Sequence, residues 1–122
     1  MHTHQHWIGG RWQPARGTLE SYDPATAQPW ALVARGTAAD VDDAVQAAAE
    51  AFPAWRRTGP SARAAALWAL GDLIAENAGD LAALEARDAR KVIRETTGQI
   101  TGLRNWYRYY ASLAYHGEGA TI

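Results

Sequence analysis

Residues 61–96 read SARAAALWALGDLIAENAGDLAALEARDARKVIRET, and this stretch decides the fold. Apolar residues recur in it at steps of three or four, which is the spacing of one face of an α-helix. They are Leu67, Leu70, Ile74, Ala78, Leu81 and Leu84. Charged residues take the opposite side, at Arg63, Asp72, Glu76, Asp80 and Arg87. The pattern predicts amphipathic helices that turn one face to a dry neighbour and the other to water.

We expect a break in this stretch at residues 77–80, which read NAGD. Gly79 is unfavourable inside a helix, and Asp80 can cap the turn that follows it. Two consecutive helices are therefore expected instead of one long one. Ser61 is expected to be the N-cap of the first helix.

The residues before this stretch predict short strands and turns. Gly9-Gly10 separates Trp7-Ile8 from Arg11-Trp12 and suits the positive φ angles of a two-residue hairpin turn. Residues 18–22 and 30–34 are expected to be short strands on either side of a turn at residues 23–26. The first 36 residues are thus expected to hold strands and turns.

A helix is expected to begin after Thr37, because Thr37 and Asp40 have the spacing of a capping box. Pro53 is expected to limit this helix, and Trp55 to tuck beneath the connection that follows. One side of the helix is apolar and carries Val41, Ala44, Val45, Ala48 and Phe52.

A last helix is expected from about Thr97, with an aromatic middle that we interpret as packing residues. Its apolar positions are Ile100, Leu103, Tyr107, Tyr110 and Ala114, and Trp106 and Tyr109 lie beside them. Gly98 and Gly102, four residues apart, would allow another helix to approach closely. Residues 117–122 are expected to begin a further strand.

Composition excludes several classes of protein. A chain of 122 residues that is 48% hydrophobic and 20% charged is typical of a globular domain and not of a disordered one. The net charge of −1 gives no electrostatic basis for binding nucleic acid or an anionic membrane. The chain contains no cysteine, which excludes disulfides and thiolate chemistry. No apolar run is long enough to span a membrane, so a cytoplasmic protein is expected.

Three groups of polar residues are candidates for chemistry. His2, His4 and His6 alternate and could hold a nickel or copper ion, but a frayed, solvated terminus is the preferred interpretation. The carboxylates of Asp42-Asp43 and of Glu85 and Asp88 could act as acid and base only in a pocket that raises one pKa. Exposed helix carboxylates are the preferred interpretation of both pairs.

Two further candidates lie near the C-terminus. His116 stands apart from other catalytic residue types, and we interpret it as a helix-terminal residue. Gly117-Glu118-Gly119 is half of a dinucleotide fingerprint but lacks the strand, third glycine and helix in the required order. We therefore expect no catalytic, cofactor-binding or metal-ligating residue in this chain.

The order of several motifs resembles the amino-terminal portion of the aldehyde dehydrogenase superfamily. These motifs are Ile8 to Trp12, Tyr22 to Thr26, Thr37 to Trp55, Ser61 to Glu85, and Lys91 to Glu95. The resemblance runs in one register from about Trp7 to Ile122. It departs from the family pattern at Ala27, where a glycine is usual, and at Ala89-Arg90, where Asn-Gly is usual before the lysine. A tight positive-φ turn at the second place is therefore expected to be altered.

The resemblance implies a fold and a function. The family oxidises aldehydes with NAD or NADP through a cysteine nucleophile and a glutamate base, which belong to later segments of such proteins. The fold class implied here is an α+β fragment, mainly α, with short strands and about four helices that begin the α/β fold of the family. Residues 1–122 would then form a single incomplete domain, with strands over 1–36 and helices over 37–116, similar to the start of the cofactor-binding domain.

Two functions remain open from the sequence. The first is an inactive structural segment or subunit of an NAD(P)-dependent dehydrogenase, which needs a chain carrying the remaining domains and binds no cofactor alone. The second is a stand-alone helical interaction module that self-associates or docks on a full-length dehydrogenase. A small enzyme with unrelated chemistry is the least favoured. The exposed apolar face expected in either of the first two cases predicts oligomers or poor solubility.

Overall fold

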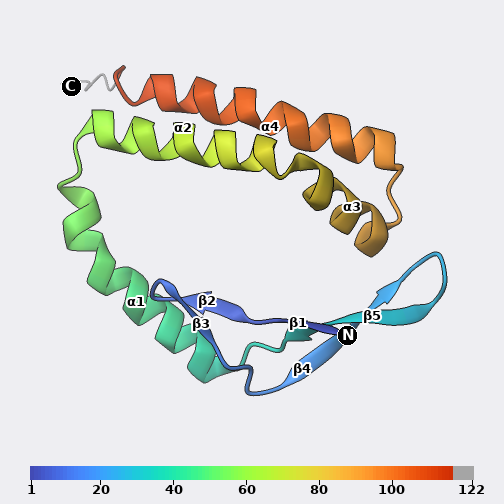
Figure 1. Ribbon diagram of the computed structural model, residues 1–122. Coiled ribbons are helices and arrows are strands. Elements are labelled where there is room, and N and C mark those ends of the chain that lie inside the picture. Colours follow the sequence, from blue (N-terminus) through green and yellow to red (C-terminus); the bar gives the residue numbers. More distant parts are fainter. Residues whose placement is uncertain (117–122) are drawn as a thin grey trace, which may run out of the picture. The chain divides into compact units, whose positions relative to one another are not determined.

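Short strands come first and helices follow in the computed structural model, which describes residues 1–116 (Figure 1). The strands are β1 (His2–His4), β2 (His6–Ile8), β3 (Arg11–Gln13), β4 (Thr18–Asp23) and β5 (Gln28–Ala34). The helices are α1 (Ala38–Arg56), α2 (Pro60–Glu76), α3 (Ala78–Ala89) and α4 (Ile93–Leu113). The predicted fold class is confirmed. The strand expected to start in residues 117–122 lies outside the described residues.

The chain divides into two compact units, Met1–Arg57 and a second that begins at Thr58. The first unit holds the five strands and α1, and the second holds α2, α3 and α4. Each unit is described by itself below. That residues 1–122 form one incomplete domain stays a prediction.

In the first unit, β2 and β3 form the predicted hairpin. Gly9 and Gly10 have φ angles of 62° and 77°, which a two-residue turn of the hairpin type requires and which glycine adopts at little cost. Trp7 pairs with Trp12 across the strands, and their ring centroids are 4.9 Å apart. A Cβ added at Gly9 would lie 3.6 Å from Cβ of Ala47, so the turn contacts α1.

A three-stranded sheet with the order β1-β5-β4 completes the strands of the first unit. β1 runs parallel to β5, with His2 opposite Ala31 and His4 opposite Val33. The interpretation of His2 to His4 as a frayed terminus is therefore wrong, because backbone pairing with β5 holds these residues in a strand. Local sequence could not show this, since the partner strand lies about 30 residues away, beyond any hairpin distance.

The turn between β4 and β5 places a non-glycine residue in the left-handed backbone region. Ala27 has a φ of 55°, and its amide donates to the carbonyl of Asp23 at 2.8 Å. The Asp23 side chain also accepts from the amide of Ala25 at 2.8 Å. Arg90, which caps the end of α3, has a φ of 52°. The positive-φ turn expected to be altered at Arg90 is thus retained, and both departures from the family pattern place an L-residue where glycine is favoured.

The capping box that opens α1 is confirmed. The Thr37 side chain accepts from the backbone of Asp40, and the Asp40 side chain accepts from the backbone of Thr37. Pro53 does not end the helix, which continues to Arg56. Trp55 is not tucked away, since 51% of it is exposed.

In the second unit, the predicted break between two helices is confirmed, at Asn77. This residue ends α2 and precedes α3, and its side-chain amide donates to the carbonyl of Leu73 at 2.8 Å. Asp80 lies in the first turn of α3 and is not its cap. Gly59 replaces Ser61 as the N-cap of α2, because Pro60 occupies the first helical position, which suits its fixed φ.

The close approach of α2 and α4 occurs at Gly71. A Cβ added there would lie 3.2 Å from Cβ of Tyr107 and 3.3 Å from the carbonyl oxygen of Arg104. Among the described residues nothing lies within 4 Å of a Cβ added at Gly98 or Gly102, so the close approach that their spacing would allow does not occur there. Helix α4 also begins at Ile93, four residues before the expected start.

Small residues form the buried apolar core of the described chain. The buried apolar residues are Ala31, Ala34, Ala64, Ala78, Ala82 and Ala111. Gly71 is buried as well. Ala64, Gly71 and Ala78 are seven residues apart, which places them along one line of the helical surface. The large residues of the predicted stripe lie beside this line, and Leu70, Leu81 and Leu84 remain 37–42% exposed. The apolar residues that are fully buried are therefore small, and many large ones stay at the surface.

The backbone at Ala27 gives a first prediction. An L-residue in the left-handed region costs about 1–2 kcal/mol, which glycine avoids. Ala27→Gly should therefore raise the free energy of unfolding by about 1 kcal/mol in urea titrations followed by circular dichroism. Ala25→Gly is the matched control in the same turn and should lower it by about 0.5 kcal/mol, because glycine adds unfolded-state entropy there without relieving strain. Equal effects of the two substitutions would contradict the strained turn.

The seam at Gly71 gives a second prediction. Gly71→Ala should lower the free energy of unfolding by about 1–3 kcal/mol, because its methyl group would crowd the α4 backbone. Gly98→Ala is the control within a helix and should raise it by about 0.5–1 kcal/mol through helix propensity. Urea unfolding, followed by helical circular dichroism, measures both. Stabilisation by Gly71→Ala would show that the helices do not approach at this point.

Candidate functional site

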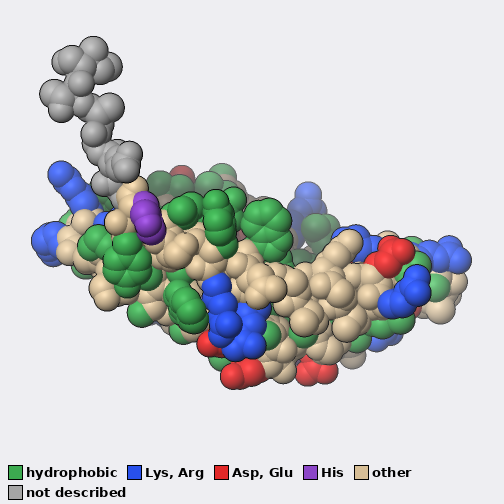
Figure 2. Space-filling model, turned by 90° about the horizontal axis from the view of Figure 1, so that it is seen from above, with side chains coloured by type: hydrophobic (Ala, Val, Ile, Leu, Met, Phe, Trp, Pro, Cys, Tyr) green, Lys and Arg blue, Asp and Glu red, His purple; other side chains and the backbone are tan. Residues whose placement is uncertain are grey.

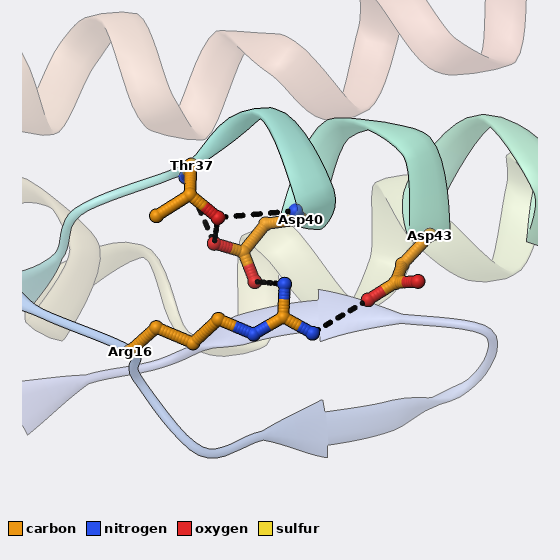
Figure 3. Close-up of polar contacts among 4 residues, drawn as sticks. All are labelled: Arg16, Thr37, Asp40 and Asp43. Carbon is orange, nitrogen blue, oxygen red and sulfur yellow. Dashed lines mark hydrogen bonds and ion pairs between the residues drawn. The ribbon is translucent and has the colours of Figure 1, made fainter.

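Four polar residues meet at the start of α1 (Figure 3). Arg16 reaches the helix from the connection between β3 and β4, with Nη1 3.2 Å from Oδ1 of Asp40 and Nη2 3.0 Å from Oδ2 of Asp43. Thr37 donates to Oδ2 of Asp40 from its amide at 2.8 Å and from its hydroxyl at 2.6 Å. The cluster thus ties the strand connection to the N-terminus of α1.

Asp40 is the centre of this cluster and is only 7% exposed. The Thr37 hydroxyl hydrogen bond, then its backbone hydrogen bond and the nearby charge of Arg16, hold the pKa of the Asp40 carboxyl below its usual value. The positive end of α1 favours the same ionised form. A carboxylate with a lowered pKa and both oxygens engaged is a poor proton acceptor near neutral pH, so the arrangement serves as a structural clamp.

The two carboxylate pairs considered for acid–base chemistry are placed differently. Asp43 is bound by Arg16, and Asp42 beside it is exposed on α1. Glu85 pairs with the Nζ atom of Lys91 across the end of α3. Neither Asp43 nor Glu85 is held in an enclosed apolar pocket, which is the environment that raises a carboxyl pKa for catalysis.

A second polar cluster joins α2 to α4. Oδ1 of Asp72 accepts from Nε of Arg104 at 2.7 Å and from Nη2 of Arg108 at 2.9 Å. The hydrogen bond from Arg104 is the main reason that the pKa of Asp72 lies below its usual value. The guanidinium of Arg108 also lies over the Trp68 ring, 4.8 Å from its centroid. These contacts fasten the helix pair next to Gly71.

Sequence reasoning missed this second cluster; Asp72, expected on the face toward water, has a side chain that is 40% exposed and also binds α4. Its two partners are 32 and 36 residues further along the chain. Helical periodicity reports contacts three or four residues apart and carries no signal for such a pairing. Gly71, next to Asp72, was the available signal for a close approach of α4.

The histidines do not form one group. His2 and His4 lie on β1 with ring centroids 4.5 Å apart, whereas His6 lies on β2 with its ring beside Gly36. Within residues 1–116, no group of three or more His, Asp or Glu side chains is placed to hold a metal ion. Nδ1 of His116 lies 3.0 Å from the carbonyl oxygen of Ser112, just beyond the end of α4. The Gly117-Glu118-Gly119 motif lies outside the described residues.

An aromatic face is exposed on α4. We define it by Trp106, Tyr109 and Tyr110, which are 61%, 58% and 53% exposed. Trp106 and Tyr110 are stacked with ring centroids 6.1 Å apart, and a surface hollow that includes Gly102 lies over them. Figure 2, which views the molecule from above α4, shows hydrophobic side chains at the surface along this helix. The interpretation of the aromatic residues as packing residues holds for Tyr107, which lies beside Gly71. It does not hold for the aromatic face, which the described chain leaves exposed.

A second apolar surface runs along α2 and α3. Its groove, of about 460 Å³, is lined mainly by Leu73, Ile74, Leu81 and Leu84. On α1, in the other unit, Val41, Val45 and Phe52 are 57–63% exposed. Each of these helices thus presents an apolar face that the described residues of its own unit leave exposed.

Comparison with known proteins identifies what these elements resemble. The model of the family described as "Aldehyde dehydrogenase family" matches residues 12–122. A (Z)-2-((N-methylformamido)methylene)-5-hydroxybutyrolactone dehydrogenase of Acinetobacter baylyi is 39% identical over 124 aligned residues, covering 100% of this chain and 25% of that protein. The chain therefore spans about a quarter of the length of the curated relatives it matches.

Solved structures agree with the sequence matches. The crystal structure of HpcC from Thermus thermophilus superposes with a TM-score of 0.92 and 36% identity, over 97% of this chain and 24% of that one. PnpE, solved in complex with nicotinamide adenine dinucleotide, superposes with a TM-score of 0.91 and 35% identity, over 98% of this chain and 25% of that one. The strands and helices described above are thus the ones that begin these proteins.

The helices also bear on membrane association. Among residues 1–116, no helix combines the length and the hydrophobicity that crossing a bilayer requires.

The clamp at α1 gives a third prediction. Because the pKa of Asp40 is lower in the folded chain, its contribution to stability is fully present above the unfolded value of about 3.9 and is lost as the pH falls below it. Asp40→Asn should therefore lower the free energy of unfolding at pH 7. The free energy of unfolding of this variant should also fall less than that of the unmodified chain when the pH is lowered from about 5 to about 2. Unfolding in urea across this pH range measures both effects.

Asp42→Asn is the matched control, because Asp42 is exposed on the same turn of α1. It should leave the pH dependence close to that of the unmodified chain. An unchanged pH dependence in Asp40→Asn would contradict the clamp.

Proposed function

Because this chain belongs to the aldehyde dehydrogenase family, we propose that it is the amino-terminal segment of an NAD(P)-dependent aldehyde-oxidising enzyme, in which it has a structural role. The observation that carries the proposal is a match along nearly the whole chain to about a quarter of each relative. The segment supplies the opening strands and the helices that lie on the cofactor-binding sheet of such an enzyme.

The chemistry of the proposed enzyme belongs to other segments. The family resemblance implies a cysteine nucleophile, and the chain contains no cysteine. The carboxyls of Asp40 and Asp72 have pKa values below their usual range and bind arginine. They are suited to holding elements together and not to taking up a proton from a substrate. The chain alone is therefore expected to be inactive and to bind neither NAD nor NADP.

The exposed apolar faces support a role in assembly. Soluble monomers rarely expose apolar patches larger than a few hundred Å². Here the groove around Leu81 and Leu84 and the aromatic face of α4 both lie open on the second unit. The proposed partner is the polypeptide that carries the remaining dehydrogenase domains, because the helices of this family segment cover a sheet that residues 1–116 do not contain.

The alternative is a stand-alone helical interaction module that self-associates or docks on a full-length dehydrogenase. The same exposed faces favour it, since two copies could cover each other's apolar grooves. The two functions differ in what completes the protein: a cofactor-binding chain in the first, and a second copy or an intact enzyme in the second.

A fourth prediction separates them. The chain is co-expressed with the part of the Acinetobacter baylyi dehydrogenase that it does not match. We expect a purified complex that reduces NAD with that enzyme's substrate, whereas the chain alone shows no turnover and no saturable heat of NAD binding in calorimetry. Leu81→Asp with Leu84→Asp should abolish the complex, because charge would have to be buried in the apolar contact.

Ala83→Asp is the matched control, because Ala83 is an exposed residue of α3 outside the groove, and it should leave the complex intact. Oligomers of the chain that capture no partner and are dispersed by the double substitution would favour the interaction module. Turnover or tight NAD binding by the chain alone would overturn both functions.

A further inference from the structure

β1 presents two imidazoles from one side of a strand. Side chains two residues apart point to the same face, and the rings of His2 and His4 are in contact with centroids 4.5 Å apart and planes at 72°. Pairing with β5, through His2 opposite Ala31 and His4 opposite Val33, holds the backbone between them in an extended form. The two rings are therefore kept close by the strand itself.

The ring separation is short enough for both imidazoles to bind one ion. A metal–nitrogen bond of about 2.0–2.1 Å places an imidazole centroid about 3.2 Å from the ion, so two rings bound with a nitrogen–metal–nitrogen angle of about 90° would have centroids about 4.5 Å apart. A tetrahedral angle would separate them by about 5.2 Å. Right angles between neighbouring ligands are typical of tetragonal Cu²⁺ and Ni²⁺ sites. We propose that His2 and His4 form a two-imidazole site for Cu²⁺ or Ni²⁺, with water at the other positions.

The surroundings of the pair leave space for the ion and its water. A surface hollow of about 390 Å³ is lined by both histidines and by Thr3, Gln5 and Trp12. His4 also meets the ring of Trp30 edge-on at 6.2 Å, which restricts its orientation. The ligands of the site come from β1, so the proposal is independent of the proposed dehydrogenase role.

His6 is excluded from the site, although it continues the alternation. It belongs to β2, which pairs with β3 and not with β5, and its ring lies against Gly36. The sequence pattern suggests three equivalent histidines, whereas the structure selects two. The interpretation of these histidines as a frayed terminus does not hold for His2 and His4, because β1 pairs with β5.

The chemistry of the ligands fixes the selectivity. Neutral imidazole binds Cu²⁺ more tightly than Ni²⁺ or Zn²⁺ and has little affinity for Mg²⁺ or Ca²⁺. Since protons compete with metals for imidazole nitrogen, affinity should fall as the pH is lowered. Paramagnetic Cu²⁺ at this site would also lie near Trp30 and Trp12, so binding should quench tryptophan fluorescence.

The fifth prediction tests the site in the full chain by titration with Cu²⁺ and with Ni²⁺, followed by calorimetry and electron paramagnetic resonance. We expect one Cu²⁺ per chain, coupled to two imidazole nitrogens. His2→Ala and His4→Ala should each weaken binding at least tenfold, and the double substitution should abolish it. His6→Ala and His116→Ala are the matched controls and should change affinity less than twofold. N-terminal acetylation should also leave the imidazole coupling in place.

Three results would overturn the proposal. Loss of Cu²⁺ binding on acetylation alone would place the ion on the terminal amine. An equal loss in His6→Ala would show that the three histidines act as a flexible group. Binding that persists in the double substitution would show that the ion is adventitious. Circular dichroism of each variant verifies that the sheet is unchanged.

Discussion

The seam between α2 and α4 is the constraint on which the rest of the helical unit depends. At Gly71 the two helices come so close that a methyl group would meet Tyr107 and the carbonyl of Arg104 at 3.2–3.3 Å. The approach occurs where α2 carries a glycine, and the other buried residue of α2, Ala64, is also small. Tyr107 belongs to this contact, whereas Leu81, Leu84, Trp106, Tyr109 and Tyr110 remain exposed.

Each unit is fastened by one carboxylate with a lowered pKa. Asp40 ties the strand connection to α1 through Arg16, and Asp72 ties α2 to α4 through Arg104 and Arg108. In both cases hydrogen bonds to the ionised form outweigh the cost of partial desolvation. Asp40 and Asp72, whose carboxyl pKa values are shifted, therefore position elements of the fold and do not act as catalytic groups. These structural roles agree with the proposal that the segment supports an active site formed by other segments of the enzyme.

Family membership explains why the exposed faces and the small core occur together. The chain matches about a quarter of each relative, and the superposed structures continue well beyond the matched part. A helix that covers a sheet in a larger protein retains its apolar side whether or not the sheet is present. The aromatic face of α4 and the groove on α2 and α3 are exposed in the described chain, which agrees with the structural role proposed for the segment.

The sequence by itself determined the local elements: the glycine hairpin, the Thr37 capping box and the break near Asn77 follow from residue type and spacing. The order of the motifs, in turn, carried the resemblance to the family. It could not determine which side of each helix is buried, because that depends on a partner more than 30 residues away, as for Asp72 and Arg104. It also left His2 to His4 without a strand partner, which parallel pairing with β5 supplies. Tertiary structure alone decided these points, because contact between distant segments fixes burial and ring geometry, whereas local periodicity only limits the choices.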